Sequence, residues 1–452
     1  MYLSESRRND ADKASGDGAD GPPPPGGGGE AAGPRGPGGA GRIVVGNVLA
    51  LGMVSFLTDI SSEMITAVLP LYLVFHLGVS TIQFGLLDGL YTGATAVLRL
   101  VGGHVADRFQ RRKAVAGAGY GLSAVTKLGF LAAGTNVPLI GLVIGVDRTG
   151  KGLRTAPRDA IISLSAPNDG QGRAFGFHRA LDTAGALLGP LATFGVLWLT
   201  LDAYDSVFSV SFCVALAGVL VLALFVREPE MPSMPDKGGK ERLTFGAAAG
   251  MLRVAPFRRV VIAVLPLSLM TISDAFLALL AQQRLDIAAN WLPLVPVGIS
   301  AAYLVAAMPF GRLADRYGPS RVMLGGYLAV LACYLLVIFG GGVAALVAAL
   351  GLRGLGYAAT DGVVSALAGP LVPKERRTMG LAIVQTGQAL AAMAGAWCFG
   401  ALWTLLGPRP ALAAMATGLG LALVLAAVLL RGGSSPFSGR FARGAARGKE
   451  TA

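Results

Sequence analysis

The segment GHVADRFQRRK (103–113) has a counterpart, GRLADRYGPSR (311–321), in the second half of the chain. Each copy has a glycine, three further residues, and then Asp-Arg followed by an aromatic side chain. Each copy also lies directly after an apolar stretch, at the matching place in its half of the sequence. Two such copies indicate that the chain arose by duplication of one structural unit.

The composition requires a membrane environment. The chain has 452 residues, of which 53% are hydrophobic and only 14% are charged, and its mean hydropathy is +0.61. Soluble domains contain about 25% charged residues. A soluble core could not bury this much apolar surface, so we expect an integral membrane protein whose apolar surface faces lipid.

The apolar stretches predict roughly twelve membrane-spanning helices of about twenty residues or slightly more. We therefore expect an all-α membrane protein made of two six-helix bundles related by a pseudo-two-fold axis. The approximate limits of the spans are 46–75, 80–103, 114–134, 138–160, 173–198, 205–226, 258–282, 291–312, 321–341, 343–367, 378–405 and 410–431.

Basic residues divide the chain further. They gather in alternate gaps between spans, which places both termini in the cytoplasm and leaves short loops outside. Residues 1–42 are rich in glycine and proline and predict a disordered tail without a cleavable signal. The loop 227–257 separates an N-terminal bundle (43–226) from a C-terminal bundle (258–431), and a basic tail (432–452) follows.

Other protein classes are not supported. The net charge of +12 would suggest nucleic-acid binding in a soluble protein, but here it sets membrane orientation. The three cysteines lie in apolar segments and have no metal-ligand spacing. The spans contain no H-E-x-x-H, no G-x-S-x-G and no paired Cys/His set. We therefore expect no enzyme activity, no cofactor and no metal.

The two G-x-x-x-D-R loops in a 6+6 arrangement resemble the major facilitator superfamily over about 43–431. In that family the loop packs at the cytoplasmic ends of spans, and its charges stabilise one conformation of the transport cycle. The resemblance implies a conformational gate, while simple topology-setting charges are the alternative. The gate residues implied are Gly103, Asp107, Arg108, Arg111 and Arg112 in the first copy, and Gly311, Asp315 and Arg316 in the second. Gln110 replaces a usual glycine in the first copy. Pro319 and Ser320 replace the paired basic residues in the second copy, so we expect a weaker second gate.

The stretch GVDRTGKGLRTAPRD (145–159) nearly spells a phosphate-binding loop. Gly152 stands where such a loop needs Ser or Thr, and no strand precedes it, so we exclude a nucleotide site. Arg148 with Gly152 instead resembles the family's fourth-span R-x-x-x-G motif. Arg148 lies roughly 15 Å deep and must face a polar cavity or a partner. Arg154, Arg158 and Asp159 are expected nearer the membrane surface.

Three carboxylates are candidates for proton coupling. Asp59 and Glu63 lie one helical turn apart in the first span, roughly 20 Å or more from the cytoplasmic end. A carboxylate at that depth binds protons readily unless it is paired. The alternative is fixed ion pairing with Arg148, Lys151 or Lys127. Asp182 of the fifth span is the third candidate, and its spacing predicts a pair with His178.

The fifth span also contains Gly185, Gly189 and Pro190, which match the core of the G-x-x-x-G-P signature of facilitator antiporters. Thr193 and Phe194 stand where further glycines are usual, so the match is partial. It favours efflux, and the alternative is an ordinary packing seam of small residues with a kink.

The remaining charged residues of the spans are candidates for the substrate cavity. Six acids and six bases in the spans nearly balance, which predicts a paired network, and the bases favour an anionic or zwitterionic substrate. The candidates are Arg148, Lys151, Asp88, Lys127, His178, Arg179, Asp274 and Arg353.

These patterns predict a proton-coupled secondary transporter that works by alternating access in the cytoplasmic membrane, with export favoured. Its expected partners are a small molecule, protons and the lipid bilayer, and we expect a monomer. The alternatives are an uptake symporter or uniporter on the same fold, or a receptor that does not transport. TDISSEM, DRTGKGLRTAPRDA and GRAFGFHRALDTAGALLGP also resemble a widespread bacterial subgroup assigned mostly as general permeases, which names no substrate.

Overall fold

The computed structural model describes residues 38–109, 111–166, 171–228, 251–285, 288–372 and 377–431. The predicted tail up to residue 37, most of the predicted loop 227–257 and the tail 432–452 lie outside these residues. The first helix starts at Gly38, several residues before the span that the apolar pattern predicted.

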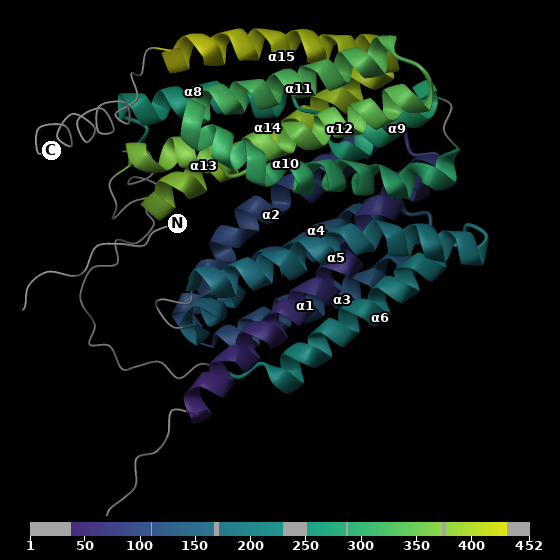
Figure 1. Ribbon diagram of the computed structural model, residues 1–452. Helices are drawn as coiled ribbons and strands as arrows, with labels where there is room; N and C mark the ends of the chain where they lie inside the picture. Colours follow the sequence, from purple (N-terminus) through teal and green to yellow (C-terminus); the bar gives the residue numbers. More distant parts are fainter. Residues whose placement is uncertain are drawn as a thin grey trace, which may run out of the picture.

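The N-terminal half consists of helices that match the first six predicted spans (Figure 1). α1 packs against both α5 and α6, while α4 packs against both α2 and α3. The elements are α1 (Gly38–Pro70), η1 (Leu71–His76), α2 (Thr81–Phe109), α3 (Arg112–Ala133), α4 (Val137–Ser165), α5 (Gln171–Thr200) and α6 (Tyr204–Phe225).

The C-terminal half matches the other six predicted spans, two of which are broken helices. The seventh span is α8 and α9 with a non-helical segment at 270–273, and the tenth is α12 and α13 with a break at 361–362. The elements are α8 (Ala255–Leu269), α9 (Asp274–Leu285), η2 (Ala289–Leu294), α10 (Val295–Tyr317), α11 (Pro319–Phe339), α12 (Gly342–Thr360), α13 (Val363–Ala368), η3 (Gly369–Leu371), α14 (Arg377–Leu406) and α15 (Pro408–Arg431).

The predicted all-α membrane fold is confirmed. Within the described residues, nine helical stretches are long and apolar enough to cross a membrane. The other three predicted spans are α2, α3 and α4. In α4 the apolar sequence is interrupted by four charged residues, Asp147, Arg148, Lys151 and Arg154. These charges give α4 a composition that is unfavourable for a helix facing lipid.

The helices alternate in direction and give the molecule two ends. The basic end carries residues 38 and 431, the last residues of α2, α4 and α10, and the first residues of α3, α5, α11 and α14 (Figure 1). The short-loop end carries the connections 77–80, 134–136, 201–203, 340–341 and 407 and the last residues of α9. The N-terminal helices are inclined to the C-terminal ones, so that the two groups converge toward the short-loop end (Figure 1).

Two glycines of α5 allow close contact with α1. A Cβ atom added to Gly185 would lie 2.5 Å from the carbonyl oxygen of Phe56, and one added to Gly189 would lie 2.7 Å from that of Ile60. Both distances are too short for any larger residue. The glycines of the antiporter-like signature therefore form a packing seam between α1 and α5 in this structure.

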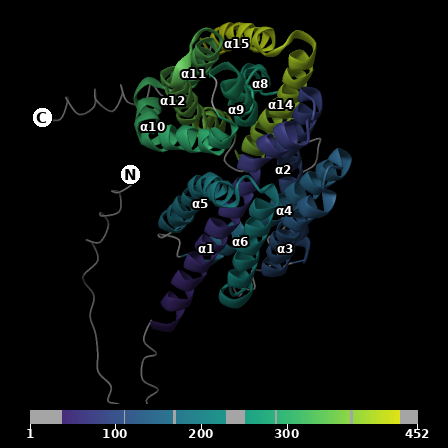
Figure 2. The same cartoon turned by 90° about the vertical axis from the view of Figure 1, so that its right-hand side faces the viewer.

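The two halves meet through α2 and α14, which lie side by side near the short-loop end (Figure 2). A Cβ added to Gly85 would lie 2.7 Å from the carbonyl oxygen of Ala396, and one added to Gly400 would lie 2.6 Å from that of Thr81. The hydroxyl groups of Thr81 and Thr404 are hydrogen-bonded at 2.8 Å. These contacts hold the halves together at the short-loop end.

Aromatic rings extend this contact between halves. Phe84 of α2 packs edge-on against Phe276 of α9, with ring centroids 4.9 Å apart. Phe194 of α5 lies 5.7 Å from Trp291 of η2. The short-loop end is therefore closed by glycine contacts and aromatic packing, and its opening requires these surfaces to separate.

A cross-link tests this contact. In a variant without native cysteines, Thr81→Cys and Thr404→Cys should form a disulfide under mild oxidation, because the two side chains touch. The measurement is the mobility shift of the oxidised protein and its reversal by reductant. Gly85→Leu in the same background should reduce the cross-linked fraction, since the added side chain would collide with α14.

The matched control is Thr81→Cys with Thr417→Cys, because Thr417 lies exposed on α15. Equal cross-linking of the control pair, or of the Gly85→Leu variant, would contradict the contact described here.

Candidate functional site

A buried cluster around Asp147 joins α3 and α4. Lys127 donates to Oδ1 of Asp147 at 2.6 Å, and Nε of Arg148 donates to Oδ2 at 2.9 Å. Ser123 and Thr126 donate to the same Oδ1 at 3.0 and 3.1 Å. A buried charge is tolerated when such partners compensate its lost hydration. The negative charge of this carboxylate is balanced by Lys127 and Arg148.

The backbone contact between α3 and α4 explains how the short side chains reach Asp147. A Cβ added to Gly150 of α4 would lie 2.7 Å from the carbonyl oxygen of Gly119 on α3. The small residues bring the two backbones together, so the hydroxyl groups of Ser123 and Thr126 lie within hydrogen-bonding distance of the next helix.

Arg148 extends this cluster to two further helices. Its guanidinium lies over the ring of Tyr91 on α2, 3.7 Å from the ring centroid. The hydroxyl of Tyr91 is in turn hydrogen-bonded to that of Thr66 on α1. Arg148 is only 2% exposed, so the structure confirms the expected partner for an arginine at this depth.

A second charged cluster lies between α1, α4 and α5, closer to the basic end. Arg154 approaches Asp59 at 4.0 Å, and Arg158 approaches Asp182 at 3.8 Å. The side chains of Asp59 and Asp182 are also close enough to interact electrostatically with each other. The repulsion between two ionised carboxyl groups so placed is opposed by the nearby arginines and is removed when one carboxyl group holds a proton.

Arg154 lies nearer the basic end than Arg148, but its side chain is buried between helices. Arg154 is 3% exposed, and its guanidinium lies 4.6 Å from the ring centroid of Tyr120. Helix α4 is surrounded by α1, α2 and α3 along this part of its length, so its charges meet other helices instead of the membrane surface.

The predicted pair between His178 and Asp182 is also not formed between these described side chains. Nε2 of His178 is hydrogen-bonded to Oγ of Ser55 at 3.2 Å. Asp182 instead contacts Arg158 and, at 3.7 Å, the exposed Arg179. A carboxylate is attracted more strongly to two guanidinium groups than to a neutral imidazole, which explains the difference.

Fixed pairing of Asp59 or Glu63 with Arg148, Lys151 or Lys127 is likewise not observed. Asp147 takes both Lys127 and Arg148. Among the described side chains, three charged candidates for proton coupling or the substrate cavity therefore have no ion pair within 4.0 Å, although the side chain of Lys151 interacts electrostatically with its charged neighbours. These three are Glu63, Lys151 and Asp88.

The C-terminal half repeats the arrangement with fewer charges. Nε of Arg353 on α12 donates to Asp274 at 2.8 Å, and Nη2 donates to the carbonyl oxygen of Ile272 at 2.8 Å. Tyr357 donates to Asp274 at 3.1 Å, and its ring lies 4.7 Å from the guanidinium. Arg353 thus binds the buried, non-helical backbone of the break between α8 and α9, and like Arg148 it combines an aspartate with a tyrosine.

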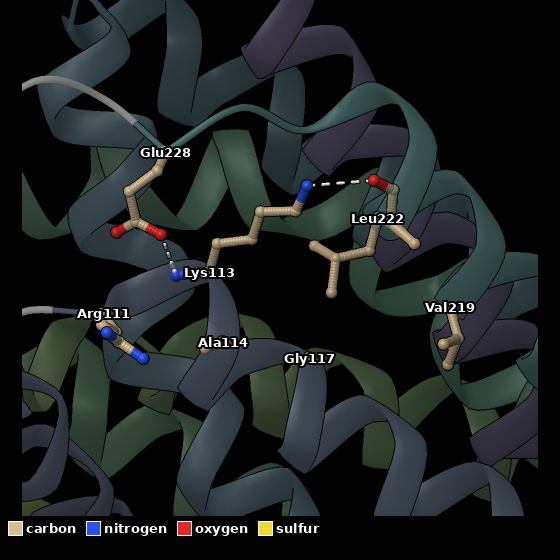
Figure 3. Close-up of a pocket in the computed structure, with 8 residues that line it drawn as sticks. Arg111, Lys113, Ala114, Gly117, Val219, Leu222 and Glu228 are labelled. Carbon is tan, nitrogen blue, oxygen red and sulfur yellow. Dashed lines mark hydrogen bonds between the residues drawn. The ribbon is translucent and has the colours of Figure 1, made fainter.

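A pocket of about 470 Å³ lies between α3 and α6 at the basic end, away from these clusters (Figure 3). Glu228 accepts hydrogen bonds from the backbone N–H groups of Arg112 and Lys113 at 2.9 and 2.8 Å, and Lys113 donates to Ala223 (Figure 3). Glu228 therefore caps the start of α3. Glu228 and Lys113, the hydrogen-bonded polar residues of this pocket, therefore fix the start of α3 against the end of α6.

The predicted gate residues lie at the basic end. The side chains of Gly103, Asp107 and Arg108 fall outside the described part of α2, whereas Arg111 and Arg112 precede and begin α3. In the second copy, Gly311, Asp315 and Arg316 are exposed at the end of α10. Their roles as a gate stay predictions.

The sequence analysis missed the glycines of α2 that meet α14. Gly85, Gly89 and Gly93 recur every four residues and place one small-residue stripe along the helix. Each of them faces a residue of α14. The spacing was a visible signal, but it did not indicate which helix would cover the stripe.

Removal of the Asp147 charge should destabilise the protein strongly. Asp147→Asn leaves Lys127 and Arg148 buried without their carboxylate, and a broken buried pair costs about 3–5 kcal/mol. Thermal unfolding of the purified protein in detergent measures the loss. Asp205→Asn, which alters an exposed carboxylate at the start of α6, serves as the control.

The double variant Asp147→Asn/Lys127→Met should recover part of the lost stability, because one of the two unpaired charges is removed. An unchanged unfolding temperature in Asp147→Asn would show that the cluster does not stabilise the fold.

A protein family and two sequence relatives match this chain. A family model described as Major Facilitator Superfamily matches residues 51–300 and 269–449. An uncharacterised MFS-type transporter of Methanocaldococcus jannaschii is 31% identical over 367 residues, which cover 79% of this chain and 88% of the relative. An uncharacterised protein of Mycobacterium tuberculosis is 33% identical over 202 residues, covering 42% of this chain and 46% of that protein.

Solved structures share the fold. The nucleoside transporter NupG has a TM-score of 0.67 at 17% identity and covers 85% of this chain and 98% of its own. A bacterial homologue of the human lysosomal transporter Spinster, in an inward-facing and unoccupied conformation, has a TM-score of 0.70 at 16% identity and covers 89% of this chain and 100% of its own. At these identities the likeness concerns the fold alone.

Proposed function

The chain belongs to the major facilitator superfamily and is a multi-pass membrane transporter, and we propose that it exports a small molecule in exchange for protons by alternating access. The observation that carries the proposal is the buried charged cluster in which Asp59 lies opposite Arg154 and Asp182 lies opposite Arg158. These two neighbouring carboxyl groups would supply a site that binds and releases a proton within the membrane.

We infer that the structure represents the inward-facing state. The halves 43–226 and 258–431 are in contact at the short-loop end through α2 and α14. The excess of basic residues at the other end supports a cytoplasmic location for it and for both termini, in the cytoplasmic membrane. Transport then requires rotation of one half against the other, with the gate residues of the basic end meeting in the outward-facing state.

Proton exchange at the Asp59–Asp182 pair changes the charge of the cluster. When the pair holds a proton, one negative charge remains opposite Arg154 and Arg158. Loss of that proton leaves two carboxylates whose mutual repulsion is opposed by both arginines. The two states favour different spacings of α1 and α5, the helices that carry the carboxylates. Because these helices are in close contact at Gly185 and Gly189, their spacing responds to a change in the repulsion between the carboxylates.

The substrate is proposed to bind between the unpaired charges Lys151 and Glu63. Lys151 interacts electrostatically with Arg148 and Arg154 and also with the carboxylates of Asp59 and Glu63, so it is surrounded by charges of both signs. An anionic or zwitterionic molecule would compensate these positive charges, and Glu63 would receive a cationic group of a zwitterion. Arg353 and Asp274 supply the corresponding charged groups of the C-terminal half.

Export is proposed on the partial antiporter signature in α5, which here forms the close contact with α1. Uptake by symport or uniport on the same fold is the second candidate, because free Glu63 and Lys151 are compatible with either direction. The direction of pH-linked flux in proteoliposomes of known orientation decides between them.

Neutral variants of the carboxyl pair test proton coupling. A panel of small organic anions, zwitterions and toxins is first screened by counterflow in proteoliposomes. For a molecule that is transported, Asp59→Asn and Asp182→Asn should abolish accumulation driven by a pH gradient and retain counterflow, because exchange of substrate requires no net proton movement. Asp205→Asn should transport like the unaltered protein. Full gradient-driven transport in both variants would refute coupling through this pair.

Replacement of Lys151 tests the substrate site. Lys151→Met should raise the Kd for the transported molecule about tenfold or more, since a charged hydrogen bond contributes about 1.5–3 kcal/mol. Thermal stability should change little, because Lys151 has no ion pair within the described residues. Arg259→Met, at an exposed position of α8, is the matched control, and equal Kd values in both variants would exclude Lys151 from binding.

A further inference from the structure

Asp88 lies at the contact between the two halves and is not part of either charged cluster. It is carried by α2, one turn from Tyr91 and next to Gly89, which faces Trp397 of α14. Its side chain is close enough to Ser273 and Asp274 of the C-terminal half to interact with both. A carboxyl group of one half therefore lies close enough to a carboxylate of the other half for the two to interact electrostatically.

The surroundings of Asp88 leave one of its oxygens without a partner. Oδ2 is buried and forms no hydrogen bond with any described residue. The adjoining space is a pocket of about 30 Å³ between α1, α2, α4 and α9, and most of its lining is apolar, including Phe84, Leu87 and Ile144. An ionised oxygen in such a place would lose its hydration without compensation.

Among the described residues, the charged and titratable groups near Asp88 offer it no free cation. On α9, Asp274 is already bound by Arg353 and Tyr357 of α12. On α2 itself, Tyr91 is occupied by Arg148 of α4, which is held by Asp147. α1 contributes Thr66 to the pocket, and the residues of α14 that meet this part of α2, which are Met393, Ala396, Trp397 and Gly400, are not titratable.

These observations decide which form of Asp88 the closed interface accommodates. A negative charge would face the carboxylate of Asp274 and would have one oxygen buried among apolar side chains. A neutral carboxyl group avoids the repulsion and can donate a hydrogen bond. Separation of the halves at the short-loop end would expose the group to water, where the ionised form is favoured.

We propose that Asp88 is a further proton-binding site, which holds a proton while the short-loop end is closed and exchanges it with the compartment at that end when the halves separate. Closure of this end then requires Asp88 to take up a proton from that compartment. Asp88 thus belongs to the contact between halves, and its earlier assignment to the substrate cavity is replaced.

This inference deepens the proposed function, because it couples the return to the inward-facing state to a proton taken from the outside. Because the Asp88 proton is taken from and returned to the same compartment, it makes closure depend on the pH at that end, while the proton that crosses the membrane is carried by Asp59 and Asp182 of the proposed function. The inference depends on the conformation of the halves and not on the identity of the substrate.

Distances between spin labels at the short-loop end test the inference without a substrate. The full chain lacking its native cysteines carries labels at Leu201→Cys and Val343→Cys, which are 92% and 69% exposed and lie in different halves. In lipid nanodiscs, rising pH should move the distance distribution toward longer values. Asp88→Asn, which mimics the neutral form, should keep the short distance at every pH.

Asp88→Glu should retain a pH response, because it keeps a titratable carboxyl group, and Asp205→Asn should respond like the unaltered protein. Monodisperse gel filtration of each variant verifies folding. A pH response in Asp88→Asn equal to that of the unaltered protein, or no response in the unaltered protein, would overturn the inference. Loss of gradient-driven transport in Asp59→Asn with an intact pH response of the labels would separate the two proton sites.

Discussion

The burial of ionised groups in a membrane bundle is the constraint on which this structure depends. The charge of Asp147 is compensated by direct contacts with Lys127 and Arg148 and by two hydroxyl groups that donate to the same carboxylate. This arrangement fixes α3 against α4 and orients Arg148 toward Tyr91, and through Tyr91 toward α1. The matched cluster supplies a rigid frame. Charges that it leaves unpaired, such as Lys151, can serve a ligand because they are not needed to hold the helices.

Glycine contacts divide the molecule into parts that stay together and parts that separate. Those between α1 and α5 lie within one half, whereas those between α2 and α14 join the halves at one end only. Backbone contacts of this kind have no long side chains to interlock, so they are close in one state and can part without leaving large cavities. Asp88 lies at the separable contact, which places an ionisable group where motion changes its exposure to water.

Much of the candidate site followed from spacing and depth. The sequence shows an arginine embedded at the matching place of each half, Arg148 in the first and Arg353 in the second. In the structure each of these arginines contacts an aspartate and a tyrosine. Specific pairs were less predictable. His178 bonds to Ser55 of another helix, and Arg154 is buried, because helix α4 is covered by neighbours whose identity depends on packing.

Apolar periodicity and basic loops by themselves determined the class of protein, the twelve helices and their alternation, because the cost of exposing polar backbone or charge to lipid acts on each segment separately. Tertiary structure decided which charges pair, which glycines meet and which end is closed. Those outcomes depend on contacts between helices far apart in the chain, as when Asp88 of α2 comes to face Asp274 of α9, and no single segment carries the information that brings them together.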